Sequence, residues 1–204
     1  MDALYFDLDG TLVEYDVPFP TIYRDAFDAF DADPGDVAAF GAALGDAFRD
    51  GADDPFAAAI DATDVAVDPA EFSEAFVASE LEHTEAIPGA PGVLDALSAE
   101  HRLGVLTNGY GPLQRAKLDA LDLSRHLDAV VVSGDVGARK PDPEIYAAAE
   151  DRLPADGYAF VADDLERDLR PAPDSWRLVH VSPDDPGAPD VAHAPSIERV
   201  CDKL

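Results

Sequence analysis

Residues 1–11 read Met-Asp-Ala-Leu-Tyr-Phe-Asp-Leu-Asp-Gly-Thr, an apolar run that ends in two aspartates and a glycine. Residues 3–6 predict a short buried strand, because β-forming residues occur in a run too short for a helix. Side chains two apart in an extended segment project to the same side, so Asp7 and Asp9 can face one site. Gly10 permits the sharp turn that follows. Ligands of open α/β sheets bind at the carboxyl ends of strands, so this stretch predicts a fold class and a site.

Strand and helix patterns alternate from residue 87 to the end of the chain. The expected strands are 103–106, 129–132, 158–162 and 178–181, and the expected helices are 92–100, 113–121, 143–152 and 196–203. Apolar strands separated by helices are typical of a parallel sheet covered on both faces. Together with residues 3–6 they predict an α/β fold with a five-stranded parallel sheet. Residues 183–195, rich in Pro, Asp and Gly, predict an exposed loop.

Phenylalanine is concentrated in the segment after the first strand. Eight of the ten phenylalanines lie between Phe19 and Phe76, at spacings that suit helix faces. Pro and Gly residues divide this segment into short pieces. We therefore expect three or four short helices packed as a small bundle, inserted into the α/β chain directly after Asp7 and Asp9.

The acidic composition argues against several classes of partner. A formal net charge of -29 and a sequence pI near 4.1 would repel nucleic acid and anionic membrane surfaces. No apolar run approaches the roughly 18 residues of a membrane span, and the acidic start does not resemble a signal peptide. The sole cysteine, Cys201, fits a reducing compartment, and its spacing from Ile197 and Val200 predicts a buried helical position. We expect a cytoplasmic protein.

Lysine is rare in this chain. Only three lysines accompany eleven arginines, whereas aspartate occupies 32 of the 204 positions. This pattern resembles proteins of salt-loving organisms. At about 1 M salt the Debye length is near 3 Å, so the surface carboxylates would barely repel one another. We therefore expect a halophilic protein whose fold loosens when salt is removed.

Each expected strand is followed by polar residues. A parallel sheet would bring these residues to one edge beside the opening aspartates, and Mg²⁺ favours such oxygen ligands together with phosphate oxygens. Taken alone, residues 107–109 also fit an ordinary turn, and Lys140 also fits a solvated loop. Asp164 and Asp168 also fit the generally high aspartate content of the chain. The residues are Thr107, Asn108, Gly109, Ser133, Gly134, Lys140, Asp163, Asp164 and Asp168.

These motifs, in this order, resemble those of the haloacid dehalogenase-like hydrolases. The matching segments are residues 7–11 (Asp-Leu-Asp-Gly-Thr), 107–109 (Thr-Asn-Gly), 139–146 (Arg-Lys-Pro-Asp-Pro-Glu-Ile-Tyr) and 161–168 (Val-Ala-Asp-Asp-Leu-Glu-Arg-Asp). The resemblance covers nearly the whole chain. It implies a Rossmann-like catalytic core over residues 1–15 and 86–204, with an all-helical cap domain over residues 16–85.

The resemblance also implies roles for individual residues. Asp7 would attack phosphorus to give an aspartyl-phosphate, and Asp9 would protonate the leaving oxygen and then activate water. Thr107 and Lys140 would hold the phosphoryl group, and the amides of the turn could assist them. The candidate substrate-binding residues are therefore Thr107, Asn108, Gly109 and Lys140.

Magnesium is the cofactor that the resemblance implies. Its ligands would be the carboxylates of Asp7 and Asp163 and the backbone carbonyl of Asp9. Two positions depart from the family pattern: Ala162 stands where glycine is usual, and Asp164 where serine or threonine is common. Neither removes a catalytic group, although both bear on the shape of the metal loop.

The expected function is a Mg²⁺-dependent phosphatase of a small phosphorylated metabolite. Haloacid dehalogenases lack a second aspartate at the position of Asp9, and phosphonate-cleaving relatives need a cap lysine, which residues 16–85 do not contain. A sugar phosphomutase remains an alternative within the family. A non-enzymatic receiver-like signalling module also combines Asp, Thr, Lys and Mg²⁺, but its acceptor is expected on a middle strand without a large helical insert.

Overall fold

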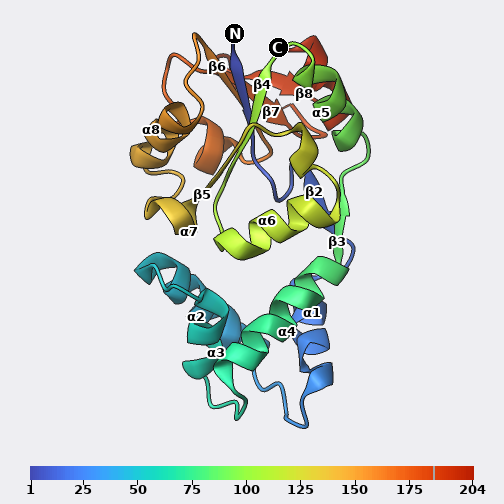
Figure 1. The fold of residues 1–204 in the computed structure, drawn as a ribbon, viewed down its shortest axis with the longest axis vertical. Coiled ribbons are helices and arrows are strands. Elements are labelled where there is room, and N and C mark those ends of the chain that lie inside the picture. Colours follow the sequence, from blue (N-terminus) through green and yellow to red (C-terminus); the bar gives the residue numbers. More distant parts are fainter. Residues whose placement is uncertain (186) are drawn as a thin grey trace. The chain divides into compact units, whose positions relative to one another are not determined.

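The structure, a computed structural model, describes residues 1–185 and 187–204. The chain divides into two compact units (Figure 1). The sheet unit consists of Met1–Glu14 and Glu85–Leu204, and the helical unit of Tyr15–Thr84. The two segments by which the chain passes between the units, β2 (Val13–Tyr15) and β3 (Thr84–Ala86), pair as a two-stranded sheet.

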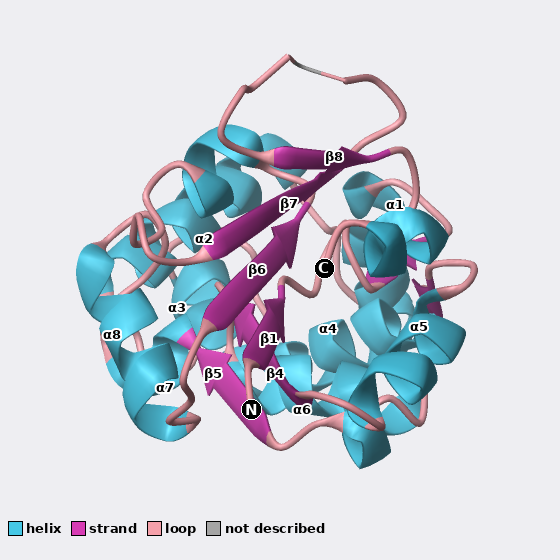
Figure 2. Ribbon diagram, turned by 90° about the horizontal axis from the view of Figure 1, so that it is seen from above, coloured by secondary structure: helices cyan, strands magenta, loops and turns pink. Residues whose placement is uncertain are grey.

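The sheet unit is built on six parallel strands, one more than the sequence predicted. Their order is β5-β4-β1-β6-β7-β8, and all neighbouring pairs are parallel (Figure 2). The strands are β1 (Ala3–Phe6), β4 (Arg102–Thr107), β5 (Ala129–Val132), β6 (Tyr158–Ala162), β7 (Arg177–Val181) and β8 (Ala192–Ala194). The α/β fold with a parallel sheet flanked by helices is therefore confirmed, and the strand count of five is wrong.

Strand β1 lies at the switch point of this sheet. The chain leaves β1 for β4 and β5 on one side, and then returns to β6, β7 and β8 on the other. Phe6, the last residue of β1, is in register with Val105 of β4 and Val161 of β6. The residue that follows, Asp7, therefore emerges between two neighbouring strands at their carboxyl ends, where open α/β sheets bind ligands.

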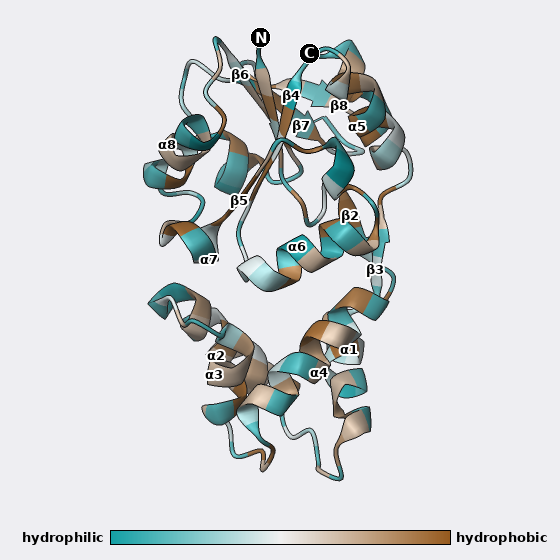
Figure 3. Ribbon diagram, viewed as in Figure 1, coloured by the Kyte–Doolittle hydropathy of each residue, from teal (hydrophilic) through white to brown (hydrophobic). Residues whose placement is uncertain are grey.

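Alternate residues of β1 enter two hydrophobic cores. Leu4 and Phe6 belong to the core on one face, and Ala3 and Tyr5 to the core on the other. Helices α5 (Ala90–Ser98) and α6 (Gly111–Ala120) cover the first face, and α8 (Pro143–Arg152) covers the second, so α5 and α8 flank the sheet in Figure 1. Both faces of the central strands are buried, which explains why they are almost continuously apolar (Figure 3).

The helical unit packs around aromatic rings. Its elements are α1 (Phe19–Asp25), the 3₁₀ turn η1 (Ala26–Ala29), α2 (Val37–Asp50), α3 (Pro55–Asp61) and α4 (Pro69–Glu82). The ring centroids of Tyr23 and Phe40 are 4.7 Å apart, and those of Phe56 and Phe76 are 4.8 Å apart. Five of the clustered phenylalanines are buried in the core of this unit, as their spacing predicts, whereas Phe19 is exposed.

Three aspartates cap the helices of this unit. The side chains of Asp36, Asp54 and Asp68 accept hydrogen bonds from the first backbone amides of α2, α3 and α4, respectively. A carboxylate at a helix N-terminus satisfies amides that have no partner within the helix and interacts favourably with the helix dipole. Part of the acidic composition therefore stabilises the local structure.

His83 joins the two ends of the helical unit. It follows α4, and its ring nitrogens lie 2.9 Å from Asp16 Oδ1 and 2.9 Å from Asp25 Oδ2. Hydrogen bonds to Asp16 and then to Asp25 raise the pKa of His83 above its usual value. Both aspartates are partners that favour the protonated imidazole.

The C-terminal region differs from the sequence prediction in three respects. Strand β8 lies inside the predicted loop 183–195, in which Pro186 is outside the described residues. The last helix is the 3₁₀ segment η4 (Ile197–Asp202), and Cys201 is exposed, so its predicted burial is wrong. With three residues per turn, Ile197 and Val200 share one face and Cys201 does not.

Three further short segments are η2 (Ser124–His126), α7 (Ser133–Val136) and η3 (Leu165–Leu169).

Candidate active site

Asp7 is a buried carboxylate held by a buried lysine. The Nζ atom of Lys140 lies 2.7 Å from Asp7 Oδ1 and also donates to the carbonyl oxygen of Leu106 at 3.0 Å. The exposed fractions of Asp7 and Lys140 are only 3% and 2%. The Asp7 backbone amide donates to the Val161 carbonyl at 2.9 Å, which continues the sheet by one residue and fixes where the side chain emerges. Main chain and side chain are therefore both held in place.

Two further carboxylates join Asp7 at this edge. Oxygen atoms of Asp7, Asp163 and Asp168 all lie within 4.8 Å of one another. Asp168, on η3, is completely buried, and its Oδ1 lies 3.3 Å from Lys140 Nζ. Burial raises the pKa of Asp7 to about 7 against the lowering effect of Lys140, and Asp168 adds to the rise. Three carboxylates therefore converge around one buried lysine.

This donor set fits a hard divalent cation. Mg²⁺ takes oxygen ligands, commonly one or two carboxylates with water and phosphate oxygens completing the shell. Three convergent carboxylates, of which those of Asp7 and Asp168 are buried, meet that requirement, and an added cation would offset their mutual repulsion. Of the predicted metal residues, the structure brings Asp7 and Asp163 together and adds Asp168. The carboxylate of Asp9 is not in the cluster.

The turn after β1 positions Asp163. The backbone amide of Asp163 donates to Thr11 Oγ1 at 3.1 Å, and Thr11 Oγ1 lies 3.3 Å from Asp163 Oδ1. Gly10 has φ of 88°, and a side chain there would collide with the Asp163 carboxylate. Glycine is thus needed at this position for both conformation and space. Burial raises the pKa of Asp163 above its usual value.

Asp9 is held by helix α6. Gln114 Nε2 lies 2.6 Å from Asp9 Oδ2, and Lys117 Nζ lies 2.8 Å from Asp9 Oδ1. Neither Gln114 nor Lys117 was predicted as a site residue. One available signal was the rarity of lysine, since two of the three lysines of the chain, Lys117 and Lys140, contact the two opening aspartates.

The turn at 107–109 supports Lys140. Asn108 Oδ1 accepts from the Lys140 backbone amide at 2.8 Å, and Asn108 Nδ2 donates to the Lys140 carbonyl at 3.0 Å. The Gly109 amide donates to Ser133 Oγ at 2.9 Å. Thr107, almost fully buried at the end of β4, accepts a hydrogen bond from Gln114 Nε2 at 3.1 Å. Asn108 therefore holds the main chain of Lys140, and Gly109 holds the side chain of Ser133.

Asp164 and Arg167 lie beside the carboxylate cluster and differ in role. Asp164 caps η3 by accepting from two backbone amides, so its acidity has a local structural use. The Arg167 guanidinium contacts Asp168 at 3.0 and 3.3 Å and lies 3.9 Å from Asp7 Oδ2. Hydrogen bonding to Asp168 raises the pKa of Arg167, which is a permanent cation at this edge.

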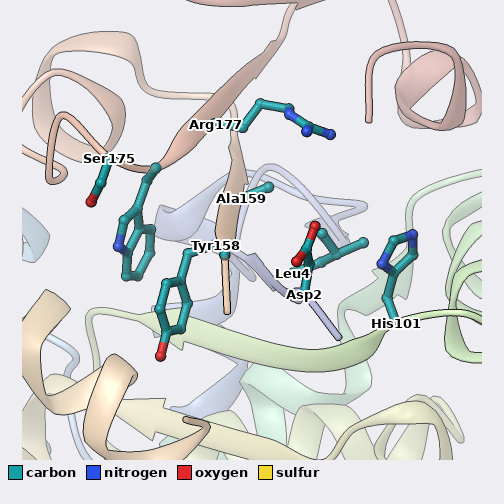
Figure 4. Close-up of a pocket in the computed structure, with 9 residues that line it drawn as sticks. Asp2, Leu4, His101, Tyr158, Ala159, Ser175 and Arg177 are labelled. Atoms are coloured by element: carbon teal, nitrogen blue, oxygen red, sulfur yellow. The ribbon is translucent and has the colours of Figure 1, made fainter. Parts of the chain in front are cut away.

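A separate hollow lies at the opposite edge of the sheet. It has a volume of about 270 Å³ and is lined by Asp2, His101, Tyr158 and Arg177, among others, where β1, β6 and β7 begin (Figure 4). None of the residues singled out from the motifs borders it. The candidate chemistry is therefore concentrated at the carboxyl edge.

Helices long and apolar enough to cross a membrane are absent from the described part of the chain.

Comparison with protein families yields a match over most of the chain. The model of the haloacid dehalogenase-like hydrolases matches residues 1–174. Among solved structures, a 2-haloacid dehalogenase from Pseudomonas syringae pv. Tomato DC3000 has a similar fold, with a TM-score of 0.77 and 21% identity. The alignment covers 100% of this chain and 98% of that one.

Two curated relatives are named as a nucleotidase and a phosphatase. Pyrimidine 5'-nucleotidase YjjG of Escherichia coli (strain K12) is 34% identical over 80 residues, which cover 39% of this chain and 36% of that protein. Phosphoserine phosphatase of Thermus thermophilus is 39% identical over 72 residues, which cover 34% of this chain and 29% of that protein. The chain thus matches about a third of the length of each relative.

Proposed function

The chain belongs to the haloacid dehalogenase-like hydrolases, and we propose that it is a Mg²⁺-dependent phosphatase of a small phosphorylated metabolite. The observation that carries the proposal is the buried Asp7 carboxylate, held by Lys140 beside Asp163 and Asp168, with the second aspartate, Asp9, two residues away. The nucleotidase and the phosphatase among the relatives support phosphate esters as substrates.

In the first step, an oxygen of Asp7 attacks phosphorus. The new bond from phosphorus to Asp7 forms as the bond from phosphorus to the leaving oxygen breaks, and Asp9 supplies the proton that the leaving oxygen takes up. The Lys140 ammonium neutralises charge on the phosphoryl oxygens, and the Thr107 hydroxyl donates to one of them. The products are an aspartyl-phosphate and a free alcohol.

In the second step, water regenerates the enzyme. Asp9 takes a proton from water as the water oxygen bonds to phosphorus, and the bond from phosphorus to Asp7 breaks. Inorganic phosphate leaves, and Asp7 is again a carboxylate. A group that donates a proton in one step and accepts one in the next returns to its starting state after each turnover.

Asp7 and Asp163 are the side chains that would hold Mg²⁺, together with the backbone carbonyl of Asp9, and Asp168 borders the same position. A bound Mg²⁺ would supply positive charge that stabilises the transferring phosphoryl group. Asn108 keeps Lys140 in reach by holding its main chain, and Thr11 and Gly10 do the same for Asp163. The helical residues 16–85 would serve as a cap that excludes water and selects the leaving group.

The second aspartate favours a phosphatase over a dehalogenase. Haloalkanoic acids release halide, which needs no proton, so a dehalogenase has no use for an acid at the position of Asp9. In this chain the Asp9 carboxylate is nevertheless present and held by two side chains. The highly acidic composition also disfavours nucleic acid and anionic membrane surfaces as substrates, and the proposed substrates are small phosphorylated molecules of the cytoplasm.

A screen of phosphorylated metabolites tests the proposal. The protein is incubated with Mg²⁺ in molar KCl, phosphate release is measured, and Asp7→Asn protein serves as the blank. We expect at least one metabolite to release phosphate with wild-type protein only, and EDTA to stop the release. Equal rates for wild type and Asp7→Asn would refute the assigned nucleophile. Halide release from 2-haloacids without phosphate release would instead identify a dehalogenase.

A further inference from the structure

Helix α6 presents two neighbouring side chains to one carboxylate. Gln114 and Lys117 are three residues apart, so they lie on the same face of the helix. Gln114 Nε2 donates to Asp9 Oδ2 at 2.6 Å, and Lys117 Nζ donates to Asp9 Oδ1 at 2.8 Å. Each oxygen of the proposed acid/base therefore has its own donor.

The Gln114 amide is fixed by further contacts. Its Nε2 atom also lies 3.1 Å from Thr107 Oγ1 and 3.3 Å from the Asn108 carbonyl oxygen. Three oxygen atoms around one nitrogen require the amide to present its N–H groups on this side. Gln114 thus connects Asp9 with the residue proposed to contact the phosphoryl group, Thr107.

Burying the Gln114 and Lys117 side chains costs desolvation free energy, so fold stability alone does not explain their position. Gln114 and Lys117 are each only 2% exposed, whereas the Asp9 side chain is 37% exposed. An ammonium group taken out of water loses hydration, and an apolar side chain would often be no less stable in such a buried position. The helix already has apolar anchors in Leu113 and Leu118.

We propose that Gln114 and Lys117 are positioning residues that fix the orientation of the Asp9 carboxylate for proton transfer. Each carboxylate oxygen has two lone pairs, so the bonds from α6 leave one on each oxygen for the proton exchanged with the leaving group or water. General acid–base catalysis requires that proton to lie within hydrogen-bond reach of the reacting oxygen. The proposal rests on the phosphatase function proposed above.

A purely structural role predicts a different result. If the two bonds only tie the turn at residues 8–12 to α6, their loss should weaken binding and catalysis for every substrate alike. If they orient Asp9, the loss should depend on how much the leaving group needs a proton. Phenyl phosphate and 4-nitrophenyl phosphate have nearly the same shape, but only phenolate needs substantial protonation as it leaves.

The experiment compares kcat/KM and kcat for these two substrates, with Mg²⁺ in molar KCl. The variants are Lys117→Met and Gln114→Met, and the matched control is Arg115→Met, which removes a cation of the same helix that pairs with the exposed Asp135. We expect kcat/KM for phenyl phosphate to fall about 30-fold in the two variants, and that for 4-nitrophenyl phosphate less than about threefold. Arg115→Met should change neither.

The second step offers an independent readout. Misplaced Asp9 slows hydrolysis of the aspartyl-phosphate, so kcat for 4-nitrophenyl phosphate should fall, and a burst of 4-nitrophenol close to the enzyme concentration should precede the slow phase. Lys117→Arg, which keeps a cation that can reach Asp9, should restore part of the phenyl phosphate activity. A structural role alone would produce neither the burst nor a dependence on the leaving group.

The outcomes separate the inference from the function. Equal losses of kcat/KM for both substrates, or no loss for either, would overturn the positioning role while leaving the phosphatase function intact. If the wild-type protein is inactive on both substrates and on all metabolites of the screen, the phosphatase function itself is refuted. If Lys117→Met fails to fold, Gln114→Met still decides the question, because it retains every charge of the chain.

Discussion

The ammonium of Lys140 lies 2.7 Å from Asp7 Oδ1 and 3.3 Å from Asp168 Oδ1, so one buried cation serves two buried carboxylates. The same ammonium donates to the Leu106 carbonyl, which uses a third N–H direction. Lys140 therefore stabilises the folded site as well as the charge that we expect to develop in it.

Replacing Lys140 by methionine should destabilise the protein and stop catalysis. Removing one partner of a buried ion pair leaves uncompensated charge, so we expect the free energy of unfolding to fall by about 3 kcal/mol. Activity should fall at least about 10³-fold, since the phosphoryl charge loses its ammonium. Urea unfolding and phosphate release measure the two effects, with Lys203→Met, an exposed lysine, as the control. A stability loss below about 1 kcal/mol would contradict the role given to the pair.

Magnesium should stabilise the wild-type protein through the carboxylate cluster. A ligand that binds only the folded state at about 100 times its Kd adds about 2.7 kcal/mol, so the midpoint of thermal unfolding should rise with MgCl₂. Asp163→Asn should remove most of this rise. Asp164→Asn is the matched control, because Asp164 is the next residue along the chain but its carboxylate caps η3 and is not part of the cluster. An equal rise in both variants would place the cation elsewhere.

The stability of the helical unit should depend on the charge of His83. Its pKa is raised above the ordinary value of 6.5 by Asp16 and Asp25, so the folded state binds the proton more tightly. The resulting stabilisation is fully present below pH 6.5 and is lost as the pH rises through the folded-state pKa. The midpoint of urea unfolding should be higher for wild type than for His83→Gln, and this difference should be larger at low pH than at high pH.

A second variant checks the cause of this pH effect. Asp25→Asn keeps His83 but removes one of its two carboxylate partners, so we expect it to retain only part of the pH dependence. A difference between wild type and His83→Gln that is the same across the range would contradict the ion-pair explanation.

Salt should stabilise the fold strongly. At a net charge of -29 the surface carboxylates repel one another over a Debye length of about 30 Å at 10 mM salt, but only about 3 Å at 1 M. We expect the midpoint of thermal unfolding to rise markedly with KCl over this range. Sucrose of equal osmolality serves as the control for general solvent effects. A midpoint that is the same in millimolar and molar KCl would contradict the halophilic assignment.

The sequence predicts the central strands well because their signal is local. Residues 3–6, 129–132 and 158–162 are apolar runs that end in polar residues, and the structure has strands at those bounds. Strand β8 gives no such signal. It is three residues of alanine and histidine at the sheet edge, and pairing with β7 rather than its own composition makes it a strand.

The candidate site is only partly visible in the sequence. Strand ends indicate Asp7 and Asp163, because a parallel sheet brings its carboxyl ends to one edge, and the rarity of lysine indicates Lys140. Gln114 and Lys117 lie in the middle of a helix, where polar residues usually face solvent. Their approach to Asp9 depends on how α6 packs on the sheet, which is a tertiary property that spacing alone does not reveal.

The aspartate caps of α2, α3, α4 and η3 set a limit on how far the acidity of this protein can be reduced by mutation. Replacing acidic surface residues with neutral ones would lessen self-repulsion, but Asp36, Asp54, Asp68 and Asp164 each hold backbone amides at a helix start. Neutralising such a residue with alanine would cost about 1 kcal/mol each time. A variant of the enzyme with fewer acidic residues should therefore carry its substitutions elsewhere, or use asparagine or serine at these four positions.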